Sequence, residues 1–468
     1  MSADAAKRSL KKLGATILAG VCVYVLGSLV FTGGVNGLAA VGNHEDPDLS
    51  RTLQLVAEGR NVFRNDTFGD QAVWGGVLGL QKAIEGEKLG GVGPGISPKT
   101  ALALGLKVDA RAIPPKVAAA IKAGKVNLDD PAVTLTLLKL NAVVGVKGFF
   151  NKHGTLSSVG ITCAVCHSTV DDSFAPGIGR RLDGWPNQDL NVGAIVAAAP
   201  NLTPLEQSLG VDETTLKKVL FGWGPGFFNA ELDLDGKAIG PDGTPHSAAT
   251  RIPSAFGKDG QNLHTWEGGW GSVTYWNAFV ANLEMHGQGN FLDARLDDAS
   301  KFPLAAAAGF GHTHPYVGEG VLPVPAQAQG PDQITEALRP LDFYEHWLPV
   351  PTPPPNSYNH AAAARGKVVF DGVGKCSSCH MGSLGTGVGY NAVKPAQICI
   401  DSFAADRGPD GTYTIAPLQA LFTRSKRGFY HDGRFKTLLD VVNHYDSCFD
   451  LHLSSGQKSD LVEYLKSR

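Results

Sequence analysis

Two short cysteine motifs, at residues 163–167 and 376–380, are the residues of this chain whose types and spacing most clearly predict chemistry. Both read C-x-x-C-H. In this pattern the two thiols add to the vinyl groups of a porphyrin, and the next imidazole reaches the iron as its proximal ligand. A zinc site would need two such pairs close in space, and a thioredoxin-like redox pair needs no histidine. The motifs therefore predict two covalently bound haem c groups, with attachment through Cys163, Cys166, Cys376 and Cys379 and metal ligation by His167 and His380.

The segments around the second motif predict one complete small haem domain. A helical pattern with Gly366 and Phe370 precedes the motif, and an amphipathic helix at residues 459–466 closes the chain. The apolar residues of this closing helix recur on one face, as in a helix that packs on a core. The arrangement resembles class I cytochrome c domains, in which the glycine lets the two helices cross closely and the aromatic residue packs on the last helix.

The same parts recur before the first motif, but they lie further apart. Gly59 and Phe63 repeat the G-x-x-x-F pattern, and about one hundred residues then separate Phe63 from Cys163. The inserted segment predicts two short helices, at 114–125 and 130–150. A closing helix is predicted at 334–348, with Thr335 as its cap and Pro340 near its middle.

The predicted fold class is mainly α, with two cytochrome c-like haem domains with long loops, preceded by an N-terminal membrane helix. The 58 glycines and 28 prolines fit loop-rich helical units better than a sheet protein. The proline-rich stretch before the second domain predicts a stiff, extended linker. The predicted division is an anchor or signal segment at 1–44, a first haem domain at 45–350 with an insertion at 64–160, a linker at 351–358 and a second haem domain at 359–468.

The N-terminus predicts export. A cluster of lysine and arginine at residues 7–12 precedes the uncharged stretch 13–31, which has the length of a membrane-spanning helix. The positive-inside rule then places the rest of the chain on the periplasmic side of a bacterial inner membrane. A small-x-small pattern at 37–39 leaves open a cleaved signal peptide, which would secrete the chain to the periplasm. Cys22 lies in the apolar stretch, and export favours a disulfide between Cys399 and Cys448.

Residues 428–445, GFYHDGRFKTLLDVVNHY, carry a family resemblance. They resemble the Y-x-H-D-G-x-x-x-T-L-x-x-V-x-x-Y stretch of bacterial di-haem cytochrome c peroxidases. Their relatives share this stretch, including the di-haem enzyme that matures tryptophan tryptophylquinone and, more distantly, the di-haem rubber oxygenases. The resemblance covers 356–468 well and 45–350 in outline. The residue that ligates the second haem is Met in the peroxidases and Tyr in the quinone-maturing enzyme, so the resemblance implies Tyr445 as a distal metal ligand.

The first domain carries a weaker echo of the same stretch. Pro253 and the segment 266–268 stand in nearly the same spacing as Pro417 and the segment 431–433. Met285 follows this echo and is the candidate distal metal ligand of the first haem, with core packing as its alternative role. His264 and His286 are rival ligands. If none of the three binds, the first haem is five-coordinate, which is the state that an enzyme needs.

Several other side chains have two readings each. One of three tryptophans can relay electrons between the haems or simply line a haem pocket. Two glutamates can act as acid and base in the cleavage of a peroxide or can be solvated carboxylates. Two arginines can pair with haem propionates or lie at the surface. The three tryptophans are Trp266, Trp270 and Trp276, the two glutamates are Glu267 and Glu284, and the two arginines are Arg251 and Arg434.

Two classes of function follow from these motifs. A formal charge of −3 gives no global attraction to nucleic acid, so no nucleic-acid partner is expected. The first class is an electron carrier that passes electrons between a membrane electron donor and a redox partner protein. The alternative is a peroxidase or oxygenase, in which the second haem supplies electrons to an open first haem and peroxide or dioxygen is the oxidant. The first domain contains no nameable catalytic constellation, which favours the carrier.

Overall fold

The computed structural model describes residues 46–258, 261–311, 331–383, 385–386 and 392–468. The chain forms two compact units, Met1–Ala57 and Glu58–Arg468. The described part of the first unit is the beginning of α2 (Pro47–Asn65). Both haem motifs lie in the second unit, which contains all the features discussed below. The proposed boundary between a first and a second haem domain near residue 350 therefore falls inside one compact unit and stays a prediction.

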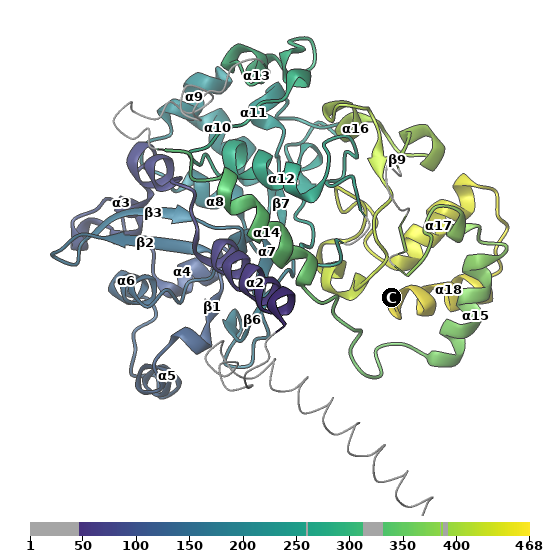
Figure 1. The fold of residues 1–468 in the computed structure, drawn as a ribbon, viewed down its shortest axis with the longest axis horizontal. Helices are drawn as coiled ribbons and strands as arrows, with labels where there is room; N and C mark the ends of the chain where they lie inside the picture. Colours follow the sequence, from purple (N-terminus) through teal and green to yellow (C-terminus); the bar gives the residue numbers. More distant parts are fainter. Residues whose placement is uncertain (1–45, 259–260, 312–330, 384, 387–391) are drawn as a thin grey trace, which may run out of the picture. The chain divides into compact units, whose positions relative to one another are not determined.

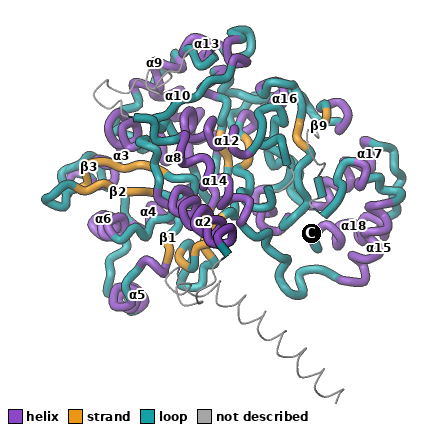
Figure 2. The backbone as a smooth tube through the Cα atoms, viewed as in Figure 1, coloured by secondary structure: helices purple, strands orange, loops and turns teal. Residues whose placement is uncertain are grey.

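Helices and long loops build this second unit, and its strands are short (Figures 1 and 2). About 47% of the structure is helical. In the described ranges the strands pair only two at a time, as β1 with β5, β2 with β3, β4 with β6, β7 with β8 and β9 with β10. The strands are β1 (Val108–Asp109), β2 (Val146–Phe150), β3 (Leu156–Ile161), β4 (Ser168–Val170), β5 (Ile178–Gly179), β6 (Arg181–Asp183), β7 (Phe227–Phe228), β8 (Thr250–Arg251), β9 (Ala392–Val393) and β10 (Tyr413–Thr414).

The α-helices follow one another along the chain with loops between them. The first C-x-x-C-H motif forms α7 with Cys163 as its N-cap, and the second begins in a short 3-10 helix, Cys376–Ser378, that follows α15. After α2 the helices are α3 (Leu80–Glu85), α4 (Pro98–Ala103), α5 (Pro115–Lys122), α6 (Pro131–Lys139), α7 (Ala164–His167), α8 (Val192–Ala197), α9 (Thr203–Leu209), α10 (Glu213–Trp223), α11 (Leu232–Asp235), α12 (Val273–Phe279), α13 (Pro303–Ala308), α14 (Thr335–Trp347), α15 (His360–Asp371), α16 (Phe403–Arg407), α17 (Leu438–Cys448) and α18 (Ser455–Lys466).

A repeated helix crossing supports each haem motif. A Cβ atom on Gly366 of α15 would lie 2.0 Å from the carbonyl oxygen of Asp460 on α18, so only glycine allows the two helices to approach this closely. A Cβ atom on Gly59 of α2 would lie 1.8 Å from the carbonyl oxygen of Pro340 on α14. Four residues after each glycine, Phe370 and Phe63 pack edge-on against Tyr464 and Tyr344, at ring-centroid distances of 5.0 and 5.5 Å. The crossing predicted from the G-x-x-x-F pattern is confirmed in both places.

The segments that follow the two motifs exchange main-chain hydrogen bonds. Arg251 N, which follows the first motif, donates to the carbonyl oxygen of His431 at 2.7 Å. Thr414 N, which follows the second motif, donates to the carbonyl oxygen of Trp266 at 2.9 Å. Trp266 and His431 belong to the two echoing stretches of the sequence, and Arg251 and Thr414 lie shortly before them. Each haem motif region is thus tied to the other half of the chain through its backbone.

The fold class predicted from the sequence requires a correction. None of the helices in the described residues has the length and apolar character needed to cross a bilayer. The predicted membrane helix at 13–31 lies outside the described residues. The described residues therefore contain no membrane-spanning helix, and the N-terminal membrane helix of the predicted fold class is not supported.

The predicted helix at 130–150 is wrong in its second half. Helix α6 ends at Lys139, Asn141 adopts a left-handed φ of 52° and Gly145 one of 74°, and the chain then continues as β2. Strand β2 pairs with β3 in an antiparallel hairpin. Valine and phenylalanine favour extended backbone, and pairing with β3 stabilises it here. At α14 the helix starts as predicted, but the Asp332 carboxylate caps it by accepting from the N–H groups of Ile334 and Thr335.

Candidate haem-binding sites

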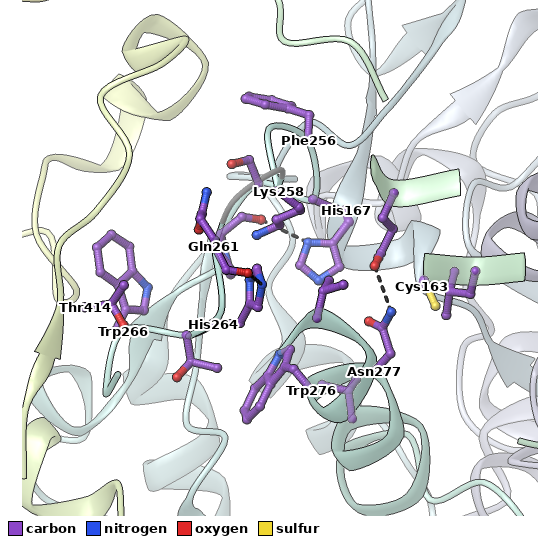
Figure 3. A pocket seen from close by; sticks show the side chains of 18 of the residues that line it. Cys163, His167, Phe256, Lys258, Gln261, His264, Trp266, Trp276, Asn277 and Thr414 are labelled. Atoms are coloured by element: carbon purple, nitrogen blue, oxygen red, sulfur yellow. Dashed lines mark hydrogen bonds between the residues drawn. The ribbon is translucent and has the colours of Figure 1, made fainter. Parts of the chain in front are cut away.

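The first C-x-x-C-H motif opens onto a cavity that encloses about 1010 Å³, part of it open to solvent. Cys163 and His167 line it at one side (Figure 3). Trp276 and Asn277 of α12 approach from below in this view, and Trp266 with Thr414 forms the edge away from Cys163. A cavity of this size suits a cofactor better than a water molecule.

The second motif opens onto a larger cavity of about 1360 Å³. Cys376, Cys379 and His380 lie along its wall. Most of the remaining lining is apolar and comes from α15, α17, α18 and the loops between them, as with Phe370, Leu418, Leu421, Val442, Phe449, Leu461 and Leu465. The four cysteines of the two motifs are free thiols in the structure, as attachment to a porphyrin requires.

Both motif histidines are oriented by the main chain in the same way. His167 Nδ1 bonds the carbonyl oxygen of Pro253 at 2.9 Å, and His380 Nδ1 bonds that of Gly385 at 2.7 Å. Because a carbonyl oxygen can only accept, each Nδ1 carries the proton and each Nε2 keeps its lone pair for a metal. Burial lowers the pKa of His167 to about 4 and also lowers that of His380. Both imidazoles are therefore neutral, which is the form that binds iron.

Two buried arginines fit the negative end of a haem. Arg251 lines the second cavity, and Arg424 lines both cavities. In the described part of the chain, neither forms an ion pair with a carboxylate. Arg251 Nη2 donates to the carbonyl oxygen of Arg424, and Arg424 Nη2 to those of Pro417 and Gln419, while Arg424 Nε has no hydrogen-bond partner. Burial lowers the pKa of Arg251 to about 9 and that of Arg424 to about 10. A buried guanidinium without an anion is costly, so haem propionates would supply the negative charge that these two arginines lack.

The two cavities share a wall, which consists of Trp266, Thr414, Ala416, Pro417 and Arg424. Trp266 is fixed in this wall at two points. Its indole Nε1 donates to the carbonyl oxygen of Arg251 at 2.9 Å, and its own carbonyl oxygen accepts from Thr414 N. Of the three tryptophans named from the sequence, Trp276 lines only the first cavity. Trp270 lines neither, because it packs with Phe279 and Phe302 in an aromatic cluster.

The structure places two of the three candidate distal ligands of the first haem in its cavity. Met285, which is 4% exposed, and His264 both line the cavity. His264 Nε2 lies 3.2 Å from the carbonyl oxygen of Gln261. His286 does not line the cavity, and its ring packs against Trp74 instead, at a centroid distance of 5.7 Å. The choice between Met285, His264 and an open position stays a prediction.

Tyr445 of α17 lines the second cavity, where the family resemblance requires its distal ligand. Its ring lies between those of Tyr430 and Phe449, at centroid distances of 6.1 and 5.5 Å. Burial raises the pKa of the Tyr445 phenol to about 12. His431, from the H-D-G segment, also lines this cavity and stacks on Tyr413.

The other side chains singled out from the sequence lie elsewhere. Glu267 and Glu284 line neither cavity; burial first, and then the neighbouring carboxylate of Glu231, raises the pKa of both. Arg434 pairs with Asp432 and Asp401, which already satisfy its charge. Cys399 and Cys448 form a disulfide, which confirms that prediction.

A polar group in the first cavity was missed by the sequence reasoning. Lys258, Asn277 and Glu345 all line this cavity, and Asn277 Nδ2 donates to Glu345 Oε2 at 2.8 Å (Figure 3). Glu345 lies on the closing helix α14 and is 4% exposed. Alignment of the two closing helices on their tyrosines would have revealed Glu345 as the odd residue, because Leu465 stands at the matching place in α18.

Neither a scan against protein-family models nor a search of curated proteins finds a match to this chain.

Proposed function

We propose that this protein is a di-haem c-type cytochrome that transfers electrons through two covalently bound haems. The haems, when bound, would supply two one-electron redox centres. The chain's own residues would hold them: two thiols and an oriented imidazole in each cavity, and Arg251 with Arg424 facing the propionates.

One observation carries this proposal, namely that the cavities behind the two C-x-x-C-H motifs meet at a common wall. An electron that moves between the cavities has only this wall to cross. Trp266 is the aromatic residue of the wall, and its hydrogen bonds to Arg251 and Thr414 hold the indole in one orientation. We assign Trp266 the relay between the two haems. A membrane electron donor would supply the electrons, and a redox partner protein would accept them.

Haem content and electron transfer between the haems test this function. Purified holoprotein should contain two c-type haems in a pyridine haemochrome assay, and a variant with Cys376→Ser and Cys379→Ser should keep one. Trp266→Phe should retain both haems but slow the redistribution of an electron after flash reduction. The matched control is Trp276→Phe, which alters only the first cavity. A protein that binds no haem overturns the function, and equal rates in Trp266→Phe and the wild type overturn the relay.

A difference between the cavities favours a second candidate function, a peroxidase or oxygenase at the first haem. The first cavity contains Lys258, Asn277 and Glu345, whereas the second is lined mostly by apolar side chains. Polar groups that exchange protons are needed where peroxide or dioxygen is reduced, but a simple carrier does not need them. The resembled peroxidases and oxygenases are likewise oxidative catalysts.

Spectra of the ferric protein separate the two candidates. An enzyme should show a five-coordinate, high-spin first haem whose spectrum changes with cyanide or peroxide. If no redox state shows such a haem and neither ligand alters the spectrum, the enzyme is excluded. Met285→Ala tests the distal ligand, because loss of a low-spin signal would support ligation by this residue. Tyr445→Phe gives the corresponding test for the second haem.

We also propose that the haem-binding unit works outside the cytoplasm. The Cys399–Cys448 disulfide supports this location, since structural disulfides persist in oxidising compartments such as the periplasm. Recovery of the disulfide-bonded holoprotein from a periplasmic extract, and not from the cytoplasm, would support the location.

A further inference from the structure

Glu345 of α14 occupies the position at which α18, the closing helix beside the second cavity, has a leucine. The helix crossings give the correspondence, because Pro340 and Tyr344 meet Gly59 as Asp460 and Tyr464 meet Gly366. Leu341 of α14 therefore matches Leu461 of α18, and Glu345 matches Leu465.

All four of these residues line a cavity. Leu341 and Glu345 line the first cavity, and Leu461 and Leu465 line the second. The two closing helices thus contribute to their cavities in the same way, and they differ at this position by a buried carboxyl group.

The surroundings of Glu345 hold it in the cavity wall. Asn277 Nδ2 of α12 donates to its Oε2, so the side chain cannot turn away without leaving a polar group unpaired. Helix α2 packs on another side of α14 through Gly59, and its cations Arg60 and Arg64 face Asp183 and Tyr344.

The groups that act on Glu345 lie on α14 itself, on α12 and in the loop that carries Lys258. Burial raises its pKa most strongly, and Asp342 raises it further, while Asn277, Lys258 and His346 oppose this rise. Cys163, which lies near enough to feel its charge, would be uncharged as a thioether. Burial also lowers the pKa of Lys258, so burial favours the uncharged form of both Glu345 and Lys258.

We propose that Glu345 exchanges a proton with solvent as the first haem changes its redox state. This inference deepens the proposed function and rests on it. When a haem bound in the first cavity gained one electron from the second haem, a Glu345 carboxylate oxygen would bind one proton from bulk water. When that haem lost the electron to the acceptor, Glu345 would return the proton to water. Lys258 lines the same cavity, and its charge favours the ionised carboxylate.

The physical cause is electrostatic. An added electron makes the cavity more negative, and a carboxylate in a poorly polarisable wall gains less from water than one at the surface. Protonation removes this repulsion. The second haem has no such group on its closing helix, so the coupling should belong to the first haem alone.

The test is a redox titration of the holoprotein as a function of pH, followed by the visible spectra of both haems. In the wild type the midpoint potential of the first haem should fall with rising pH near neutrality, by close to one proton per electron, while that of the second haem changes much less. Glu345→Gln keeps the shape and the contact with Asn277 but cannot titrate, so the slope of the first haem should disappear. Glu336→Gln, the same change at an exposed position of α14, should leave it intact.

A second readout does not depend on potentials. The infrared difference spectrum between oxidised and reduced protein should contain a protonated carboxyl band that Glu345→Gln removes and Glu336→Gln retains. If the glutamine variant loses haem, Glu345→Leu replaces it in both measurements, because leucine is the residue at the matching position, 465, of α18.

An unchanged slope in both Glu345 variants would assign the proton to another group, such as a propionate, and would overturn the inference. A wild-type slope of zero would do the same. Neither result touches the proposed function, whose failure appears in haem content and in the Trp266→Phe rate.

Discussion

Replacement of Arg407 by methionine should destabilise the second compact unit by about 3–5 kcal/mol, the usual cost of removing one partner from a buried ion pair. Arg407 is 1% exposed and binds three groups from the segment between the two C-x-x-C-H motifs. Its Nε donates to Asp235 Oδ2 at 2.7 Å, Nη1 to the carbonyl oxygen of Ala248 at 2.8 Å and Nη2 to Asn229 Oδ1 at 2.6 Å. Glu231 lies 4.0 Å from Nη1.

The size of this loss follows from what remains after the substitution. Methionine fills most of the volume of the arginine stem, so little of the loss comes from packing. What remains is a buried Asp235 carboxylate with no cation, beside a second carboxylate on Glu231. Each charge-assisted hydrogen bond contributes about 1.5–3 kcal/mol, but all of them depend on one side chain and do not add.

Urea unfolding of the holoprotein, followed by far-ultraviolet circular dichroism, measures the loss. Lys367→Met removes an exposed ion pair with Asp371 and should leave the urea midpoint unchanged. Arg407→Met combined with Asp235→Asn should recover part of the stability, because the orphaned charge is gone. A loss below about 1 kcal/mol in Arg407→Met would refute the reasoning from the buried charge.

Three further predictions concern stability and acid unfolding. Gly366→Ala would place a Cβ atom 2.0 Å from the carbonyl oxygen of Asp460 and should cost about 1–3 kcal/mol in urea unfolding, whereas Gly456→Ala, with nothing within 4 Å, should cost nothing; equal effects would argue against the close crossing. Loss of the Cys399–Cys448 disulfide, which closes a separation of 49 residues, should cost about 4 kcal/mol in the chain-entropy model, and an unchanged melting temperature in the double serine variant would contradict this. Burial raises the pKa of Asp183, but Arg64 and Arg181 lower it by more, so its stabilising effect is complete above the unfolded pKa and is lost as pH falls through the lower folded pKa. Asp183→Asn should therefore flatten the acid limb of stability against pH, and an equally steep limb would count against this ion-pair network.

Local steric and chemical requirements made parts of this structure predictable from sequence. A C-x-x-C-H motif must have both thiols and the imidazole within a few residues, and a close helix crossing must have glycine where the backbones meet. The crossings at Gly59 and Gly366 and the disulfide could therefore be anticipated. The membrane helix predicted at 13–31 lies outside the described residues, and none of the described helices could cross a bilayer.

Other features depend on contacts that spacing along the chain does not reveal. The short segment 146–150, VKGFF, has no periodicity that separates helix from strand, and its pairing with β3 decides between them. Trp266, Trp270 and Trp276 lie within eleven residues, and only the tertiary structure shows that the first of them borders both cavities. Glu345 reads as an ordinary polar position of an amphipathic helix until the neighbouring Asn277 and the cavity are seen.

The exchange of main-chain hydrogen bonds between the two halves has a consequence for how such a protein can evolve or be engineered. The first cavity takes part of its wall from residues 414–424, which follow the second motif. A gene cut at the proline-rich stretch would yield two fragments, each with its haem-attachment residues but neither with a finished pocket. The two halves look like tandem modules in sequence, yet they cannot be exchanged independently. A new second half must also supply a segment equivalent to 414–424, because this segment completes the wall of the first cavity.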